Sequence, residues 1–486
     1  MENSLRIYFL SSISIILLVA AVSVCPPAAT GQSAASGQQA SSQGSLKTEP
    51  ASPVYPDARF KADILLIVAH PDDEQGVTGY LARAMDEHKK VAVLWMTRGD
   101  TGGDRVGWAK ETALGAEREI EARQAVGFLG ITNVWFAGAP NTPSQDVLWS
   151  LERWNHGAAL EEAVRIVRLT RPEVIISLLP DYYTGENHGD HQAAGVIATE
   201  AFDMAGDPTK FPEQVVAPSV ISSDFFGTEG LRPWQPEKIY YSANPAVPFP
   251  ADEGPTYSTT DISPSRHVTY CELQRESVSF HRTQNGGFNQ TQNRGARRGN
   301  STARPCRPVD LIFGKSLVGG SVTGDVFEGV VPGPIPFAPV RGYQPETHTG
   351  LSLELAGQFA YYREFWAAHN IERIASLEPV QEFGVIPGGE LPVPLLMHDY
   401  TDSAVQIDLT VDLPPGWTEV NGSGQYPVAA RDQYPVEFRV AAPPKGTPEG
   451  KVGTWQQITW HARSAGQEIG SVTVKVYLEG HPGMPQ

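Results

Sequence analysis

Short apolar runs alternate with amphipathic segments through the middle of the chain. The apolar runs are typical of buried strands and lie near residues 62–69, 91–97, 133–137, 174–179 and 238–242. Apolar residues at helical spacing predict helices near residues 76–88, 111–129, 157–170, 191–204 and 268–282. This alternation predicts an α/β fold, with a Rossmann-like, mostly parallel sheet and helices on both of its faces.

The pattern changes near residue 378, where prolines become frequent. Runs of strict apolar–polar alternation follow at residues 404–411, 436–440 and 471–477. Such runs with turn residues between them predict a C-terminal all-β sandwich. Just before the sandwich, apolar residues at helical spacing predict a helical connector that can pack on either domain: Leu355, Phe359, Tyr362 and Trp366.

The N-terminus predicts export. One cation, Arg6, precedes an apolar core from Ile7 to Val24, and small residues follow at positions 29–31. We expect a periplasmic, cell-surface or secreted protein. The alternatives are an uncleaved anchor, since the apolar core is near spanning length, and a lipoprotein attached at Cys25, although no small residue directly precedes that cysteine.

These patterns divide the chain into five parts. They are a signal peptide (1–31), a flexible Ser/Gln/Gly-rich linker (32–58), the α/β domain (59–345), the helical connector (346–377) and the sandwich (378–486).

Charge and cysteine content restrict the partners and the compartment. The 486 residues carry a formal net charge of −18, which disfavours nucleic acid because like charges repel. Without the signal segment two cysteines remain, Cys271 and Cys306, and they can form one disulfide in an oxidising compartment. The arginine-rich residues 294–307 are interpreted as a solvated insertion.

Ionisable residues gather where two predicted strands end. Residues 69–74, Ala-His-Pro-Asp-Asp-Glu, follow the first strand, and residues 188–191, His-Gly-Asp-His, follow the fourth. Ligands bind at the carboxyl ends of strands in an open α/β sheet, so the two clusters can face one crevice. Catalytic zinc usually takes three protein ligands, which His70, Asp73 and His191 would supply.

These motifs resemble those of the LmbE-like, or PIG-L-type, family of zinc-dependent N-acetylglucosaminyl deacetylases. The first motif matches the family's Ala-His-Pro-Asp-Asp-Glu, and the second matches His-Pro-Asp-His except that Gly189 stands in place of proline. Arg118 in an Arg-x-x-Glu helix and His281 in a late His-x-Thr-Gln are weaker matches. The resemblance implies one zinc ion, or another divalent metal, per chain.

The resemblance also implies a reaction, the removal of an acetyl group from an N-acetylglucosamine-type amide by zinc-activated water. Asp72 would take a proton from that water. His188, if protonated, would face the oxyanion. Asp190 would hold or charge one of the two histidines, with His188 as the expected partner.

Roles for the remaining candidates are less specific. Arg118 would bind sugar hydroxyls or a phosphate. His281 would bind substrate, although a structural role is equally open. Glu74 is interpreted as an acid at the positive end of a helix rather than as a metal ligand.

Other functions stay open on the sequence alone. One alternative is a zinc amidase acting on a non-sugar amide, and another is a non-catalytic secreted glycan-binding protein. Residues 413–417, Leu-Pro-Pro-Gly-Trp, resemble a hallmark of Ig-like modules attached to bacterial sugar-active enzymes. This resemblance implies that the sandwich binds glycan or the cell surface, but a spacer role is an equal alternative because fold does not give function.

Overall fold

A computed structural model describes residues 56–215, 229–285, 306–345 and 347–479. The predicted signal peptide, nearly all of the linker and residues 294–305 of the arginine-rich stretch lie outside these ranges. Within the described ranges, no helix has both the length and the apolar character needed to cross a membrane.

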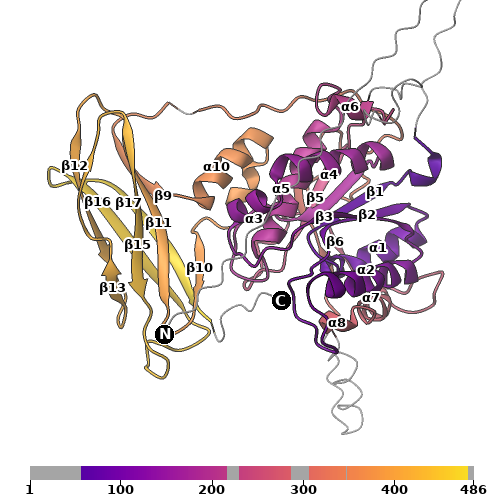
Figure 1. Ribbon diagram of the computed structural model, residues 1–486, viewed down its shortest axis with the longest axis horizontal. Helices are drawn as coiled ribbons and strands as arrows, with labels where there is room; N and C mark the ends of the chain where they lie inside the picture. Colours follow the sequence, from indigo (N-terminus) through magenta and orange to yellow (C-terminus); the bar gives the residue numbers. More distant parts are fainter. Residues whose placement is uncertain (1–55, 216–228, 286–305, 346, 480–486) are drawn as a thin grey trace, which may run out of the picture. The chain divides into compact units, whose positions relative to one another are not determined.

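The α/β domain is built on a six-stranded sheet of order β3-β2-β1-β4-β5-β8 (Figure 1). The first five strands along the chain are parallel, and β8 runs antiparallel to β5 at one edge. The mostly parallel sheet predicted from the sequence is therefore confirmed. Its strands are β1 (Ile64–Val68), β2 (Val91–Thr97), β3 (Asn133–Ala139), β4 (Val174–Leu178), β5 (Lys238–Ser242) and β8 (Ile312–Ser316).

Helices cover both faces of this sheet. Side chains alternate along a strand, so β1 contributes Leu66 to the hydrophobic core shared with α1, α2 and α7, and Ile67 to the core shared with α4 and α5. The main helices are α1 (Thr78–Asp86), α2 (Glu111–Phe128), α3 (Val147–Arg153), α4 (His156–Thr170), α5 (Gly189–Met204) and α7 (Tyr270–Val278). Shorter elements are η1 (Ala58–Phe60), η2 (Asp73–Gly76), α6 (Pro212–Val215), β6 (Thr256–Tyr257), α8 (Arg282–Asn285) and β7 (Val309–Asp310).

The strand order reverses its direction next to β1. From β1 the chain runs outward through β2 to β3 and then returns to β4 on the other side of β1. In a doubly wound sheet, ligands bind at such a switch point, outside the carboxyl ends of the strands. The two sequence motifs follow β1 and β4, so they meet at this point. Elsewhere in the domain, Cys271 and Cys306 form the disulfide that the sequence allowed.

The C-terminal region consists of two β-sheets that share one hydrophobic core. Their orders are β10-β17-β16-β12-β14 and β13-β15-β11-β9. This arrangement agrees with the predicted β-sandwich. The strands are β9 (Leu351–Leu355), β10 (Glu382–Val385), β11 (Glu390–Asp399), β12 (Val405–Asp412), β13 (Thr418–Asn421), β14 (Gly424–Val428), β15 (Asp432–Ala441), β16 (Trp455–Ser464) and β17 (Gln467–Leu478).

The predicted helical connector is only partly helical. Residues 351–355 form β9, which pairs antiparallel with β11, and the helix α10 spans Gln358–His369 before the short η3 (Glu372–Ser376). The prediction was wrong at Leu355. Its spacing of four residues from Phe359 fits a helix, but it also continues the alternation of Leu351 and Leu353, which fits a strand equally well. Gly357 separates the two elements with a φ of 60°, which glycine adopts readily.

Candidate active site

The first motif turns sharply as it leaves β1. Asp72 has a φ of 115°, a value that is unusual for a residue other than glycine. The turn is closed by the Asp73 carboxylate, which accepts a hydrogen bond from the His70 backbone N–H at 2.6 Å. As a result, the two adjacent carboxylates point to different partners: Asp72 to Arg118, and Asp73 to two histidines.

His70, Asp73 and His191 come together as predicted. Asp73 Oδ2 lies 3.3 Å from His70 Nδ1, and Asp73 Oδ1 lies 3.0 Å from His191 Nε2. Ligand atoms of a tetrahedral zinc ion, each about 2.0–2.2 Å from the metal, stand about 3.3 Å apart. Both histidine–carboxylate distances are close to this spacing, and imidazole and carboxylate are groups that bind zinc.

The outer nitrogens of both rings also have the partners that metal-bound histidines need. His70 Nε2 lies 3.3 Å from Asp190 Oδ2, and His191 Nδ1 lies 3.3 Å from the Glu186 carbonyl oxygen. A carboxylate or carbonyl at the far nitrogen fixes the tautomer and orientation of a ligand histidine. The Asp190 oxygen is itself held by the Thr142 N–H at 2.7 Å.

Asp190 does not have the partner expected from the sequence. Its carboxylate lies against His70 of the first motif rather than His188 of its own motif. The reason is that Asp190 lies in the first turn of α5, fully buried, where the carboxyl ends of β1 and β4 are neighbours. Sequence reasoning also missed Thr142, because a backbone N–H donor leaves no trace in residue type.

His188 stands beside the ligand pair. Its ring centroid is 4.8 Å from that of His70 and 4.0 Å from that of His191. Nitrogen atoms of these three histidines lie within 4.8 Å of one another, so His188 is a second candidate for the third ligand position. Burial, together with the charges of His191 and His70, holds the pKa of His188 well below its ordinary value. This favours a neutral imidazole, in contrast to the protonated form considered above.

The carboxylates of the site and the histidines they contact stabilise each other's charged forms. Burial disfavours a charged His70, but the carboxylates of Asp73 and Asp190 outweigh this and raise the pKa of His70 to about 9. Burial similarly opposes a charged Asp73, yet the neighbouring His191 and His70 hold its pKa well below the ordinary value. Such a cluster is stabilised by a cation in its centre, either protons on the rings or a metal ion.

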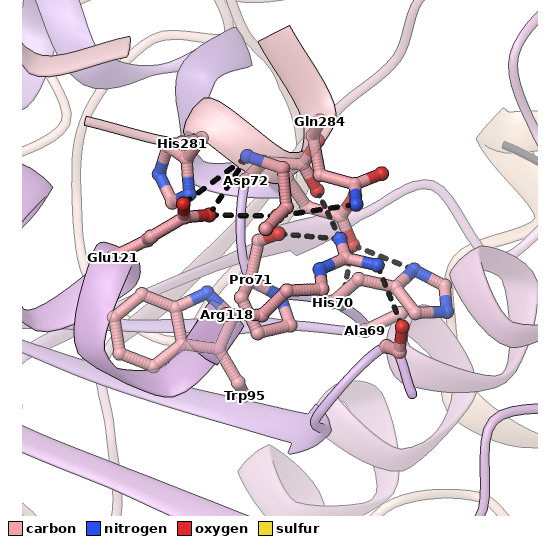
Figure 2. Close-up of polar contacts among 12 residues, drawn as sticks. Ala69, His70, Pro71, Asp72, Trp95, Arg118, Glu121, His281 and Gln284 are labelled. Carbon is pink, nitrogen blue, oxygen red and sulfur yellow. Dashed lines mark hydrogen bonds and ion pairs between the residues drawn. The ribbon is translucent and has the colours of Figure 1, made fainter. Parts of the chain in front are cut away.

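Asp72 lies on the other side of the turn, against Arg118 of α2. Arg118 Nη2 donates to Asp72 Oδ1 at 2.8 Å and to the Pro71 carbonyl oxygen at 2.6 Å, as Figure 2 shows. Its Nη1 donates to the Gly99 carbonyl oxygen at 2.8 Å. Burial, opposed by the Arg118 charge, raises the pKa of Asp72 to about 6. A carboxyl group with this pKa can both accept and release a proton near neutral pH.

The geometry favours a positioning role for Arg118. Only 2% of its surface is exposed, and the contacts above tie two of its nitrogens to the loops after β1 and β2. Its contact with substrate stays a prediction.

His281 and Glu74 form a pair that the sequence did not reveal. His281 is fully buried, and its Nε2 contacts Glu74 Oε1. Glu74 Oε2 accepts hydrogen bonds from the Asp72 N–H at 3.0 Å and from Trp95 Nε1 at 3.2 Å. Glu74 thus holds the turn that contains Asp72. This contact adds to the role that the sequence indicated, an acid at the start of a helix. The burial of His281 favours its structural alternative over direct substrate binding.

Gly189 is explained by close packing. A Cβ atom at this position would lie 2.6 Å from Ser150 Oγ and 2.7 Å from the Asp146 carbonyl oxygen. The Gly189 N–H also donates to the Ser144 carbonyl oxygen at 2.7 Å, a bond that proline cannot make. The segment containing α3 therefore packs directly on the second motif.

Comparison with known proteins agrees with this geometry. The family described as PIG-L, GlcNAc-PI de-N-acetylase, matches residues 65–202. A 1D-myo-inositol 2-acetamido-2-deoxy-alpha-D-glucopyranoside deacetylase of Thermobifida fusca is 29% identical over 46% of this chain and 82% of its own length. The enzyme of the same description from Geodermatophilus obscurus is 34% identical over 31% of this chain and 56% of its own length.

Among solved structures, an N,N'-diacetylchitobiose deacetylase from Pyrococcus horikoshii covers 51% of this chain and 84% of its own, with 18% identity and a TM-score of 0.35. Residues 65–202, which match the family, contain both motifs; these follow the adjacent strands β1 and β4, and their side chains converge. The chain therefore carries a domain of the PIG-L/LmbE-like family of GlcNAc deacetylases.

Proposed function

We propose that the protein is a metal-dependent hydrolase that removes the acetyl group from an N-acetylglucosamine-type amide. The observation that carries this proposal is the arrangement of Asp73 between His70 and His191 while Asp72 faces away, toward Arg118. This arrangement supports a metal-binding role for Asp73 and a proton-transfer role for Asp72.

His70, Asp73 and His191 would hold the metal, with zinc as the expected ion and another divalent metal as the alternative. A zinc ion bound there would supply a Lewis acid that lowers the pKa of water to about 7. Asp190 and the Glu186 carbonyl would orient the two ligand histidines from behind.

The side chains of the site would then move the protons. Asp72 would take one proton from the attacking water as its oxygen adds to the amide carbon. When the carbon–nitrogen bond breaks, Asp72 would give that proton to the departing amine, leaving a free amine and acetic acid, which releases its proton to solvent as acetate. His188, with a neutral imidazole, would donate an N–H hydrogen bond to the oxyanion.

The substrate class rests on the relatives. Those from Thermobifida fusca and Geodermatophilus obscurus are named as deacetylases of an inositol glycoside of N-acetylglucosamine. We extend the acetamido-sugar part of that substrate to this chain and leave the group attached to the sugar open. Export to the periplasm, surface or medium, and binding of glycan by the sandwich, remain parts of the proposal that rest on sequence patterns.

A substrate panel tests this function. The purified protein, with and without added zinc, is offered N-acetylglucosamine glycosides, N,N'-diacetylchitobiose and simple non-sugar acetamides, and released amine is measured. Zinc-dependent release from the acetamido sugars supports the proposal. Release from the simple amides alone would favour an amidase, and binding of the sugars without release would favour a glycan-binding protein.

A further inference from the structure

Helix α10 lies outside the residues that match the family, yet it contacts Gln192, the residue directly after the second motif of the site. Its side chains Tyr362, Phe365 and Trp366 belong to the hydrophobic core of the α/β domain. Each of these side chains is at most 5% exposed. The helix is therefore packed as a part of the α/β domain, although the chain reaches it only after β9 of the sandwich.

Tyr362 is linked to the motif through one buried side chain. Its hydroxyl donates a hydrogen bond of 2.7 Å to Gln192 Oε1. Gln192 is fully buried and directly follows His191. The other end of its amide, Nε2, donates to the Asn187 carbonyl oxygen at 2.9 Å and to the Gln145 carbonyl oxygen at 3.0 Å. The side-chain amide of Gln192 thus bonds back to residue 187, across the segment that contains His188 and His191.

A second contact from α10 holds the start of the same loop. Trp366 Nε1 donates to the Pro180 carbonyl oxygen at 2.9 Å, just beyond the end of β4. The segment from Pro180 to Gln192, which ends in the first turn of α5, is therefore bonded at both ends to side chains of α10. Between these ends it carries the carbonyl of Glu186 that contacts His191.

We infer that Tyr362 is a positioning residue for the segment of residues 187–192, and that α10 thereby helps to hold the active site in its geometry. Without the Tyr362 hydroxyl, Gln192 Oε1 would lose a donor in a buried place, and burial of an unpaired acceptor is costly. The amide would turn or shift to find another partner, and its bonds to Asn187 and Gln145 would change with it. His191 would then be held less firmly in its geometry.

The same helix touches the sandwich. Phe359, near the start of α10, belongs to the core of the sandwich, where its ring lies 5.1 Å from that of Phe383. The sandwich core and Gln192 are thus both in contact with α10.

The neighbouring tyrosine provides a matched control. Within the described part of the chain, the buried hydroxyl of Tyr361 has no hydrogen-bond partner. Tyr362→Phe and Tyr361→Phe each remove one buried oxygen from α10, but only the first removes the bond to Gln192.

The experiment compares these two variants in the full chain. Readouts are amide hydrogen exchange of residues 187–192 without metal, the dissociation constant of zinc by chelator competition, and kcat and KM for a cleaved acetamido sugar. We expect Tyr362→Phe to speed exchange in this segment, to weaken zinc binding and to lower kcat by about tenfold each, with KM unchanged. Tyr361→Phe should match the unmodified protein in all readouts.

A double variant tests whether the effect passes through Gln192. Adding Tyr362→Phe to Gln192→Leu should have no further effect, because the acceptor is already gone. Equal exchange rates in the two tyrosine variants, or effects that multiply in the double variant, would overturn the inference. The zinc and rate readouts rest on the proposed function. If the unmodified protein binds neither zinc nor another divalent metal, that function fails, while the exchange comparison still decides the role of Tyr362.

Discussion

Asp190 of the second motif and His70 of the first are in contact, with 3.3 Å between the carboxylate Oδ2 and the ring Nε2. The second motif therefore supplies, besides the candidate ligand His191, the carboxylate that orients a candidate ligand of the first motif. The two motifs depend on each other, although 120 residues separate these positions.

Removal of the Asp190 carboxylate should weaken metal binding. Asp190→Ala leaves His70 Nε2 without its acceptor, and loss of such a partner typically lowers metal affinity by about 10- to 100-fold. The measurement is a zinc titration against a competing chelator. Glu173→Ala is the control, because Glu173 is also buried and paired, with Lys61, but lies at the amino end of β4. Equal affinities of the two variants would contradict the role of Asp190.

Arg118 can be tested as a positioning residue. Arg118→Met keeps much of the buried side-chain volume but removes the bonds to Asp72, Pro71 and Gly99. We expect kcat to fall by about 100-fold with zinc content retained, because a misplaced proton acceptor is a poor base. Steady-state kinetics separates the two roles: a higher KM with unchanged kcat would instead support the substrate contact expected from the family resemblance.

The family's usual proline should not fit at position 189. Gly189→Pro would place a Cβ against Ser150 and Asp146 and would remove the bond to Ser144. We expect the free energy of unfolding to drop by about 1–3 kcal/mol, the usual cost of overpacking. Denaturant unfolding measures this, with Gly157→Ala in α4 as a control that has open space around the new Cβ and should gain up to about 1 kcal/mol. A neutral Gly189→Pro variant would show that α3 can shift away.

Long buried elements were the most predictable from the sequence. The strand predicted at 91–97 is β2 with the same bounds, and the helix predicted at 111–129 is α2 within one residue. In these segments the periodicity and the tertiary burial agree, so local pattern is sufficient. The convergence of His70, Asp73 and His191 could also be predicted, because parallel strands place their carboxyl ends on one edge of the sheet.

Other features depended on packing that a pattern does not encode. The pairing of Glu74 with His281 joins positions 207 residues apart, and no spacing rule connects them. Leu355 was assigned to a helix because the apolar residues around it fit both the helical and the strand spacing. Its pairing with Leu395 of β11 shows that it lies in a strand. The partner of Asp190 was missed for the same reason, since the neighbouring histidine in sequence is not the nearest one in space.

The position of β9 predicts how the sandwich behaves alone. A fragment of residues 378–486 lacks β9, so the edge of β11 would be exposed together with the apolar surface that Leu353 and Leu355 cover. An exposed strand edge of this kind favours association between chains. Gel filtration and urea unfolding should show a fragment that associates or unfolds more easily than the sandwich does in the full chain. A monomeric fragment of unchanged stability would mean that β9 contributes little.

The most direct test of a metal-dependent deacetylase with Asp72 as its base is the variant Asp72→Asn, measured for zinc content and for acetate release in parallel. The amide keeps the size of the carboxyl group and its acceptor oxygen for Arg118, but it cannot take the proton. We expect about one zinc ion per chain in both proteins, and acetate release that falls by about 10²- to 10⁴-fold in the variant. Acetate release at the unmodified rate in a zinc-loaded Asp72→Asn protein would contradict the role of Asp72 as the base.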